Sequence, residues 1–449
     1  MNPELERNIW LELPVRRIAM LAGILALIFF GTALVGGGSF TAITAEVLYY
    51  FFVVFWGTRS AAMSVVGEMR ARTWDMQRLS SLGAGTMVWG KLFGAAVFPW
   101  LGGAVCLVLV LVGTVSHEGA AAAAIEALYF VGIGVIAQAM ALLASLVAIS
   151  RRPTYSFFET FVYQLIGFLT AVLVFAIWKT IDPAGSFIKH TAATDFVTWW
   201  TLRIDSRAFL LASVAMFSGW TLVGCYRAMR TELKMRNGPF VWLAFLAFMG
   251  LYVAGFDAWL SPDMKAWDAV ALRLFLAGTT YAALTYIMVL LEPKDRVHYR
   301  WIWDRVRHGQ IGTALWNFQA WMMSYWATFA VTAALSLWLM HDPQAARVGL
   351  PLGLAVMGFI TRDVSIFVLM QTLPGKRRGD FAALVILLAL YVLIPWILNG
   401  LQATNALFVF YPVLPAPTWA GVAVAWIEGL AVAGLALTRI ALTDREKAR

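Results

Sequence analysis

Two groups of residues in this sequence could carry chemistry, and they lie in different surroundings. The first is a polar stretch from Glu68 to Lys91 that interrupts two apolar runs. The second consists of charged residues inside apolar runs, where a charge is costly: Arg59, Glu126, Glu159, Arg362 and Asp363. The first pattern is typical of a surface that binds a partner. The second is typical of polar packing between membrane helices or of a transport pathway.

Catalytic motifs are absent from the sequence. Gly85 to Lys91 has the spacing of a phosphate-binding loop, but Leu92 replaces the hydroxyl that would hold magnesium, and no buried strand precedes it. The five histidines are dispersed and none has a partner at metal-ligand spacing. No nucleophile elbow is present. We therefore expect no metal, no nucleotide and no catalysis in this chain alone.

The charged residues inside apolar runs leave two interpretations open. Polar packing between helices, or snorkelling to an interface, is favoured over a transport pathway, with Gln138 and Gln164 as polar companions. Arg362 and Asp363 are neighbours, so their side chains point about 100° apart on a helix. We expect each of them to pair with another helix and not with its neighbour.

The elements that position these residues are membrane-spanning helices. Hydrophobic residues make up 61% of the 449 positions and charged residues 13%, against roughly 25% charged in soluble domains. The apolar runs can cross about 30 Å of hydrocarbon as helices. They predict an all-α polytopic integral membrane protein with about twelve transmembrane helices, at residues 18–36, 44–67, 92–113, 121–149, 156–178, 207–226, 239–257, 268–291, 318–340, 348–371, 381–399 and 418–440.

The basic residues predict the orientation of these spans. With both termini on one side, the loops of that side hold 25 of the 34 Lys and Arg residues, and the loops of the other side hold 7. Cytoplasmic loops carry the excess of Lys and Arg, so we expect both termini in the cytoplasm of a bacterial cell, with the chain in its inner membrane. The cations are spread over seven loops, so the net charge of +9 reflects topology and we expect no nucleic-acid partner.

Two amphipathic segments are expected to lie in the membrane surface. Asn2 and Pro3 can begin a helix whose apolar side chains cluster on one face before the first span. A second such face, with apolar residues at i, i+3, i+4 and i+7, covers residues 299–306. Each segment precedes a span with a Thr-Arg pair, Thr58-Arg59 and Thr361-Arg362. Chance placement and a degenerate internal repeat both explain this echo.

The polar stretch from Glu68 to Lys91 resembles the loop between spans two and three in the membrane subunits of type-2 ABC exporters. Glu68, Thr73, Asp75, Gly90 and Lys91 match the offsets of that family's loop, from the initial acid to the closing Gly-Lys. Arg72 replaces the usual glycine, and residues 80–83 stand where a proline turn is common. The resemblance extends over the amphipathic entry segment and roughly the first 230 residues. It implies a coupling helix that sits in a groove of a separate ATPase subunit.

From this resemblance we expect a permease subunit of an ABC exporter. Residues 1–238 would form the six-span exporter domain, and residues 239–449 six further spans, read as two extra spans plus a degenerate partial repeat. ATP and magnesium would be bound by the partner ATPase, and a second permease subunit, the same chain or a related one, would complete the path. The residues expected at the ATPase contact are Glu68, Arg70, Arg72, Thr73, Asp75 and Arg78. The richness in Phe, Trp and Met favours an apolar or amphipathic substrate.

Two other classes remain as alternatives. An ion-gradient-driven secondary transporter with twelve spans would need buried acids to carry the coupling ion, which are sparse here, and a longer central linker than residues 226–238. A membrane-embedded transferase acting on lipid-linked substrates would need a loop with clustered acids or histidines. The sequence shows no such loop.

Overall fold

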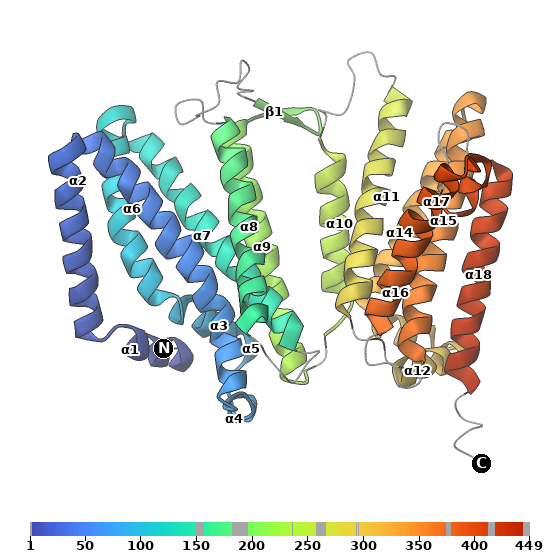
Figure 1. The fold of residues 1–449 in the computed structure, drawn as a ribbon, viewed down its shortest axis with the longest axis horizontal. Helices are drawn as coiled ribbons and strands as arrows, with labels where there is room; N and C mark the ends of the chain where they lie inside the picture. The colour runs from blue at the N-terminus through green and yellow to red at the C-terminus, as the bar shows by residue number, and fades with distance from the viewer. Residues whose placement is uncertain are drawn as a thin grey trace. The chain divides into compact units, whose positions relative to one another are not determined.

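A computed structural model describes residues 2–149, 157–181, 196–235, 237–256, 266–292, 294, 296–373, 379–411 and 418–442. Within these ranges, eleven helices are long and apolar enough to cross a membrane (Figure 1). The prediction of an all-α, multi-pass membrane protein is therefore confirmed. The chain forms two compact units: unit 1 is drawn from Met1–Thr198 and Leu202–Asn237, and unit 2 from Trp199–Thr201 and Gly238–Arg449.

Unit 1 begins with a short helix and continues with six candidate spans. The first helix, α1, starts as expected, because the Asn2 side chain accepts hydrogen bonds from the backbone N–H groups of Glu4 and Leu5, and Pro3 occupies the first helical position. The helices of the unit are α1 (Pro3–Glu12), α2 (Val15–Tyr49), η1 (Tyr50–Trp56), α3 (Gly57–Arg70), α4 (Trp74–Arg78), α5 (Ala84–Trp89), η2 (Gly90–Gly94), α6 (Val97–Glu118), α7 (Ala120–Ile149), α8 (Phe157–Ile181) and α9 (Ser206–Glu232).

Two features of unit 1 depart from regular α-helix. The hydrogen-bonded helix α2 bends at Gly37, whose φ of 68° suits glycine, and this break separates the first two expected spans. The segments η1 and η2 are π-helical turns. A small two-stranded sheet of β1 (Phe196–Trp199) and β2 (Leu202–Asp205) precedes α9 and was not expected from the sequence.

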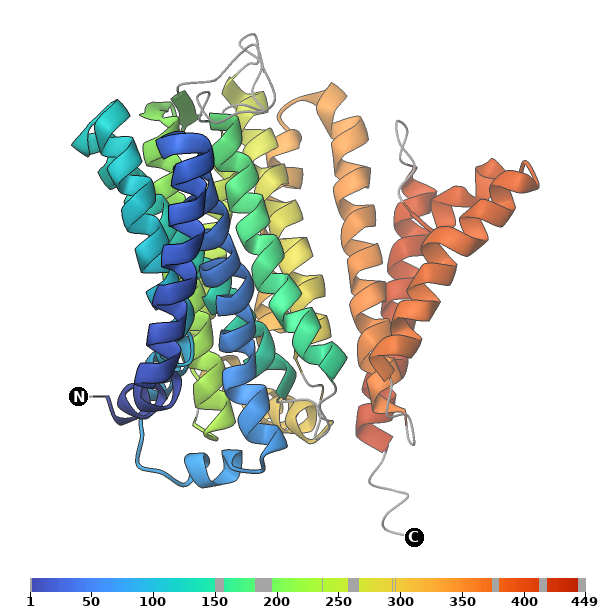
Figure 2. The same ribbon diagram turned by 60° about the vertical axis from the view of Figure 1, so that its left-hand side comes forward.

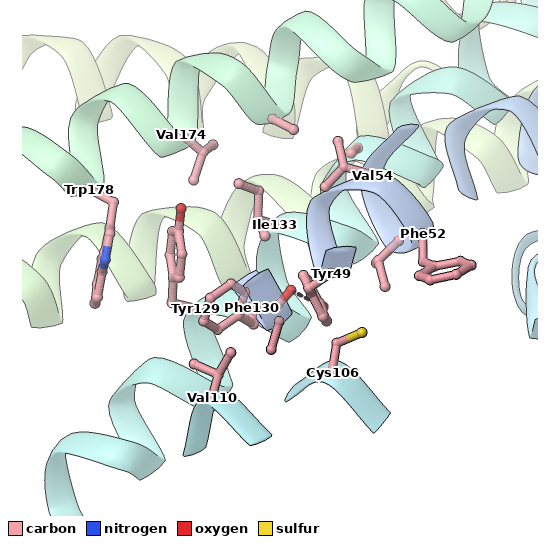
Figure 3. Packing of buried hydrophobic residues seen from close by; sticks show 14 of the residues in the cluster. Tyr49, Phe52, Val54, Cys106, Val110, Tyr129, Phe130, Ile133, Val174 and Trp178 are labelled. Carbon is pink, nitrogen blue, oxygen red and sulfur yellow. Dashed lines mark hydrogen bonds between the residues drawn. The ribbon is translucent and has the colours of Figure 1, made fainter. Parts of the chain in front are cut away.

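The core of unit 1 consists of aromatic side chains from several spans. Figure 3 shows Tyr49, Tyr129, Phe130 and Trp178 packed together, with the Tyr129 and Trp178 rings stacked at 4.2 Å. The Tyr49 hydroxyl donates to the Phe130 carbonyl oxygen at 2.6 Å. Lipid tails are as apolar as this core, so close packing and such hydrogen bonds, more than the hydrophobic effect, hold the spans together.

Unit 2 contains five of the eleven candidate spans and one shorter apolar helix. The shorter one, α10, has 15 residues, or about 22 Å of helix, and it occupies the expected span at 239–257. The count of twelve therefore stays a prediction. The helices are α10 (Phe240–Ala254), α11 (Ala266–Leu291), α12 (Arg296–Arg307), α13 (Ile311–Trp316), α14 (Ala320–Leu339), α15 (Pro343–Thr372), α16 (Gly379–Leu388), η5 (Ala389–Leu393), α17 (Ile394–Gly400), η6 (Thr404–Val409) and α18 (Trp419–Leu442).

The pair α15 and α18 forms the closest helix packing in unit 2. A Cβ atom added at Gly429 would lie 2.9 Å from the Gly358 carbonyl oxygen, and one at Gly358 would lie 2.8 Å from the Ala425 Cβ atom. Small residues at a membrane helix interface let backbones approach in this way. The close approach brings the middle of α15, with Arg362 and Asp363, against α18.

Candidate functional site

The polar stretch from Glu68 to Lys91 protrudes from the ends of α3 and α5. Figure 2 shows α4 at the tip of this loop, on the same end of unit 1 as α1. The chain turns sharply after α3 because Arg72 has a φ of 57°, in the left-handed region. Glycine is the usual residue at this position in the resembling family, and the structure shows the conformation that glycine favours.

The short helix α4 has one face on the protein and one face in solvent. Trp74 is buried, whereas Asp75, Met76 and Leu79 point outward. Leu79 is 88% exposed and Met76 73% exposed. We call these three residues the α4 tip. Large apolar side chains so exposed on a protruding helix are typical of a contact for another protein.

Beneath α4, four charged side chains form a junction between α1, the end of α3 and η2. We call Glu4, Arg7, Glu68 and Lys91 the entry clamp. Lys91 is fully buried; its ammonium group bonds the Glu68 carboxylate and lies 3.5 Å from Glu4. Arg7 bonds Glu4 at 2.9 Å and Glu68 at 2.8 Å. The two acids and the two bases of the clamp thus balance in charge. Together they connect α1 to the end of α3 and to η2.

Two further contacts hold the clamp and the base of α4. The Lys91 ammonium lies 5.2 Å from the centre of the Trp74 ring. A Cβ atom at Gly90 would lie 2.5 Å from the Glu4 side chain, so only glycine allows α1 this close. The Gly-Lys pair singled out in the sequence therefore has a structural role: Gly90 admits α1 and Lys91 neutralises its acid.

Arg78, one of the residues expected at the ATPase contact, lies partly beneath the surface of the protein. Its side chain is 29% exposed and pairs at 2.6 Å with buried Glu232 at the end of α9. Its contact with Asp75 is longer, at 3.4 Å. Asp75 lies about 100° and Arg78 about 40° around α4 from Trp74, so Arg78 falls on the protein side. Reversing the charge of Arg78 would place an acid beside buried Glu232.

The other expected ATPase contacts divide in the same way. Glu68 belongs to the entry clamp and also accepts a hydrogen bond from Gln77 at 2.5 Å. The Thr73 hydroxyl donates to the Glu68 carbonyl oxygen, and Arg70 donates to Thr160 at 3.1 Å. Arg70, Arg72, Thr73 and Asp75 are exposed. Met76 and Leu79 were missed, although their spacing of three residues on the side away from Trp74 and Arg78 is visible in the sequence.

Polar residues inside unit 1 satisfy the π-helical turn η1. A π-turn leaves carbonyl groups without their usual α-helical partners, and a membrane offers no water to replace them. The Gln138 amide donates to the Val53 carbonyl oxygen at 2.9 Å, and the Gln164 amide donates to that of Phe55 at 3.0 Å. The Trp100 indole in turn donates to Gln138 at 2.9 Å. These contacts are those of polar packing between helices.

The three charged residues expected inside the spans of unit 1 lie on three different helices. Glu126, on α7, accepts a hydrogen bond from the Thr114 hydroxyl of α6. Arg59 lies in α3 and Glu159 near the start of α8, and both are half-buried.

Arg362 and Asp363 lie in a buried polar cluster within unit 2. The Arg362 Nε atom bonds the Asp363 carboxylate at 3.1 Å, so the expectation that these neighbours would not pair is wrong. The long arginine side chain bends back far enough to bridge the 100° between them. Arg362 also bonds Glu428 of α18 at 2.8 Å, and Glu428 was missed because it is 66 residues away in the chain.

Two tyrosines complete this cluster. The hydroxyls of Tyr286 and Tyr391 each donate to the Asp363 carboxylate at 2.7 Å. The guanidinium of Arg362 lies over the ring of Tyr391 at 5.1 Å. The cluster therefore joins α11, α15, η5 and α18. Its partners are mutually satisfied, as polar packing requires.

Comparison of the chain with protein-family models, with curated proteins and with solved structures found no match. The function is therefore inferred from the α4 tip and the entry clamp. Among the described residues, no group of three or more His, Cys, Asp and Glu side chains is placed to hold a metal ion.

Proposed function

We propose that this chain is the permease subunit of an ABC transporter and that a separate ATPase subunit binds the α4 tip. The observation that carries the proposal is the contrast between the two faces of α4. The outer face presents Met76 and Leu79, while the inner face is tied to α9 by the Arg78–Glu232 ion pair. A partner could therefore bind without disturbing the fold.

The entry clamp would transmit a push on α4 to the spans. Through Glu68 and Lys91 it connects the end of α3 with the start of η2 and α6. Buried ion pairs of this kind are costly to separate, so α1, α3 and η2 would move together with α4. Closure of the partner ATPase would then change the arrangement of the spans, which is the hinge and rigid-body type of transition.

A partner that binds the α4 tip would gain mainly from apolar contact. Burial of apolar surface contributes about 25 cal/mol per Å², and one or two well-packed anchors carry most of the affinity in typical interfaces. The exposed charges of Arg72 and Asp75 would add orientation more than affinity. The residues expected from the sequence at this contact, five charged residues and Thr73, did not include Met76 and Leu79.

The interval after α15, where an internal repeat would place a second such helix, is short. In unit 2, α15 ends at Thr372 and α16 begins at Gly379, so only residues 373–378 separate them. That interval is too short for a counterpart of the 24-residue stretch around α4. We therefore include a second permease subunit, the same chain or a related one, in the proposal. The proposal also includes a location in the bacterial inner membrane with both termini in the cytoplasm. The substrate would be apolar or amphipathic and would be exported.

Co-expression of this chain with an ABC-type ATPase subunit tests the proposed class. We expect a stable complex in detergent that hydrolyses ATP, and no hydrolysis by the isolated chain. Transport in proteoliposomes should require ATP and persist when ionophores collapse ion gradients. Transport that stops with the ionophore and ignores ATP would instead support the ion-gradient-driven alternative.

A further inference from the structure

Helix α12 is anchored at the ends of two membrane spans by one of its faces. It lies between α11, which ends at Leu291, and α14, which begins at Ala320 (Figure 1). Tyr299 and Ile302 are buried, and the Tyr299 hydroxyl donates to Gln319 at 3.2 Å. Half of the apolar face expected to lie in the membrane is therefore covered by protein.

The rest of this apolar face, toward the C-terminal end of α12, is exposed and continues into α13. Trp303 is 51% exposed, and Val306 is exposed beside it on α12. The following helix α13 adds exposed Ile311, Leu315 and Trp316. Exposed tryptophan at the end of a span is typical of the level of the lipid headgroups.

Basic side chains accompany these apolar ones. Helix α12 contains four arginines and one acid, Asp304, which faces His308 at 3.4 Å. Arg300, Trp303 and Arg307 follow one another at i, i+3 and i+7 and so share one side of the helix. The Arg307 guanidinium lies 5.1 Å from the centre of the Trp303 ring.

Helix α1 provides an internal contrast. It also exposes a tryptophan, Trp10, beside Leu11. Its charged residues, however, are three glutamates and one arginine. The two helices therefore share an amphipathic design and differ in the sign of their charge.

We propose that the exposed side of α12 and α13 binds the anionic phospholipid of the bilayer surface. Trp303 and Val306 lie at the level where headgroups meet acyl chains, and Arg307, which is exposed beside Trp303, contacts lipid phosphates. Arginine matches phosphate geometry with paired donors. A soluble acidic partner would match the arginines but not the exposed tryptophan and valine beside them, at the ends of two spans. The proposal does not depend on the ATPase.

Site-specific fluorescence in nanodiscs tests this proposal on the full-length chain. Both native cysteines, Cys106 and Cys225, are fully buried, so a label can be attached to Val306→Cys or, as the matched control, to Leu11→Cys. Each label is measured in phosphatidylcholine discs that contain a small fraction of quencher-bearing lipid. The quencher is carried either by phosphatidylglycerol or by phosphatidylcholine.

We expect the label at 306 to be quenched more strongly by phosphatidylglycerol, and the label at 11 to show no such preference. Replacing Arg307 with Gln should lower the preference at 306 roughly fivefold, because each basic residue near the surface contributes about 1 kcal/mol. High salt should lower it further. The label at 11 in the same variant reports whether the protein remains folded.

Equal quenching by the two lipids at position 306 would overturn the proposal, as would an unchanged preference in the Arg307→Gln variant. A label at 306 that no lipid quenches, but that aqueous iodide does, would also overturn it. In that case the surface faces the aqueous phase and its occupant is a soluble partner.

Discussion

In each unit a buried ion pair connects the end of one span to the start of another. The acid and the cation occupy opposite positions in the two units. In unit 1 the cation, Lys91, lies at the start of the third span and its acids lie in α1 and at the end of α3. In unit 2 the acid, Asp380, begins α16, and its cation is the fully buried Lys294, at 2.9 Å, which precedes α12. Both units therefore contain such an ion pair, which we call the joint. The protruding helix α4 belongs to unit 1.

This contrast separates what holds the spans together from what faces outward. In unit 1 the ion pair Glu68–Lys91 spans the loop that contains α4, whereas in unit 2 Lys294 and Asp380 are 86 residues apart, with α14 and α15 between them. An internal repeat would explain the shared joint. The Thr58 and Thr361 hydroxyls agree with such a repeat, because each donates to the carbonyl oxygen four residues earlier, at 2.6 and 2.7 Å. The repeat stays a prediction.

The largest effect is expected from removing one partner of the buried ion pair in either joint. Lys91→Met leaves Glu4 and Glu68 with one cation, Arg7, between them, and Asp380→Asn removes the acid paired with buried Lys294. Losing one partner of a buried pair costs about 3–5 kcal/mol, so both variants should unfold at much lower denaturant concentration. Arg17→Gln, in an exposed pair with Glu12, is the control and should cost at most about 1 kcal/mol. Equal midpoints for Lys91→Met and Arg17→Gln would contradict the clamp.

A charge swap tests the second attachment of α4. Arg78→Glu should destabilise the protein by about 2–4 kcal/mol, because it brings an acid against buried Glu232. Adding Glu232→Arg should restore most of the loss, since the pair is rebuilt with its signs exchanged. Thermal unfolding in detergent measures both changes. No recovery in the double variant would show that Arg78 and Glu232 do not act as a pair.

These contacts show where sequence reasoning succeeds and where it stops. Spans follow from apolar length, and the capped start of α1 follows from Asn2 and Pro3, because both signals are local. The partners of Lys91 and Arg78 do not, because Glu4 and Glu232 lie 87 and 154 residues away in the chain. The π-turn η1 is equally hidden, because its apolar sequence would also form an α-helix. Gln138 and Gln164 were noticed as polar companions, but nothing in the sequence connects them to that turn.

A smaller effect is expected from single hydrogen bonds in the membrane. Gln138→Leu removes the donor to the Val53 carbonyl oxygen in unit 1, and Tyr391→Phe removes one donor to Asp363 in unit 2. Side-chain hydrogen bonds between membrane helices contribute about 0.6–1.7 kcal/mol, so each variant should lose about 1 kcal/mol by steric trapping or denaturant unfolding. A loss of several kcal/mol for Tyr391→Phe alone would show that Tyr286 cannot satisfy Asp363 without it.

Binding of the ATPase by the α4 tip is tested most directly by Met76→Asp combined with Leu79→Asp. Both side chains are exposed, so the change in stability should stay within about 0.5 kcal/mol, while an apolar contact would be lost. The measurement is capture of the ATPase by tagged, membrane-inserted chain, with Met76→Leu combined with Leu79→Met, which keeps the apolar surface of the α4 tip, as the matched control. We predict at least a tenfold weaker complex, equal to about 1.4 kcal/mol, for the aspartate variant and unchanged capture for the control. Capture at the parental level by an inserted aspartate variant would contradict the account.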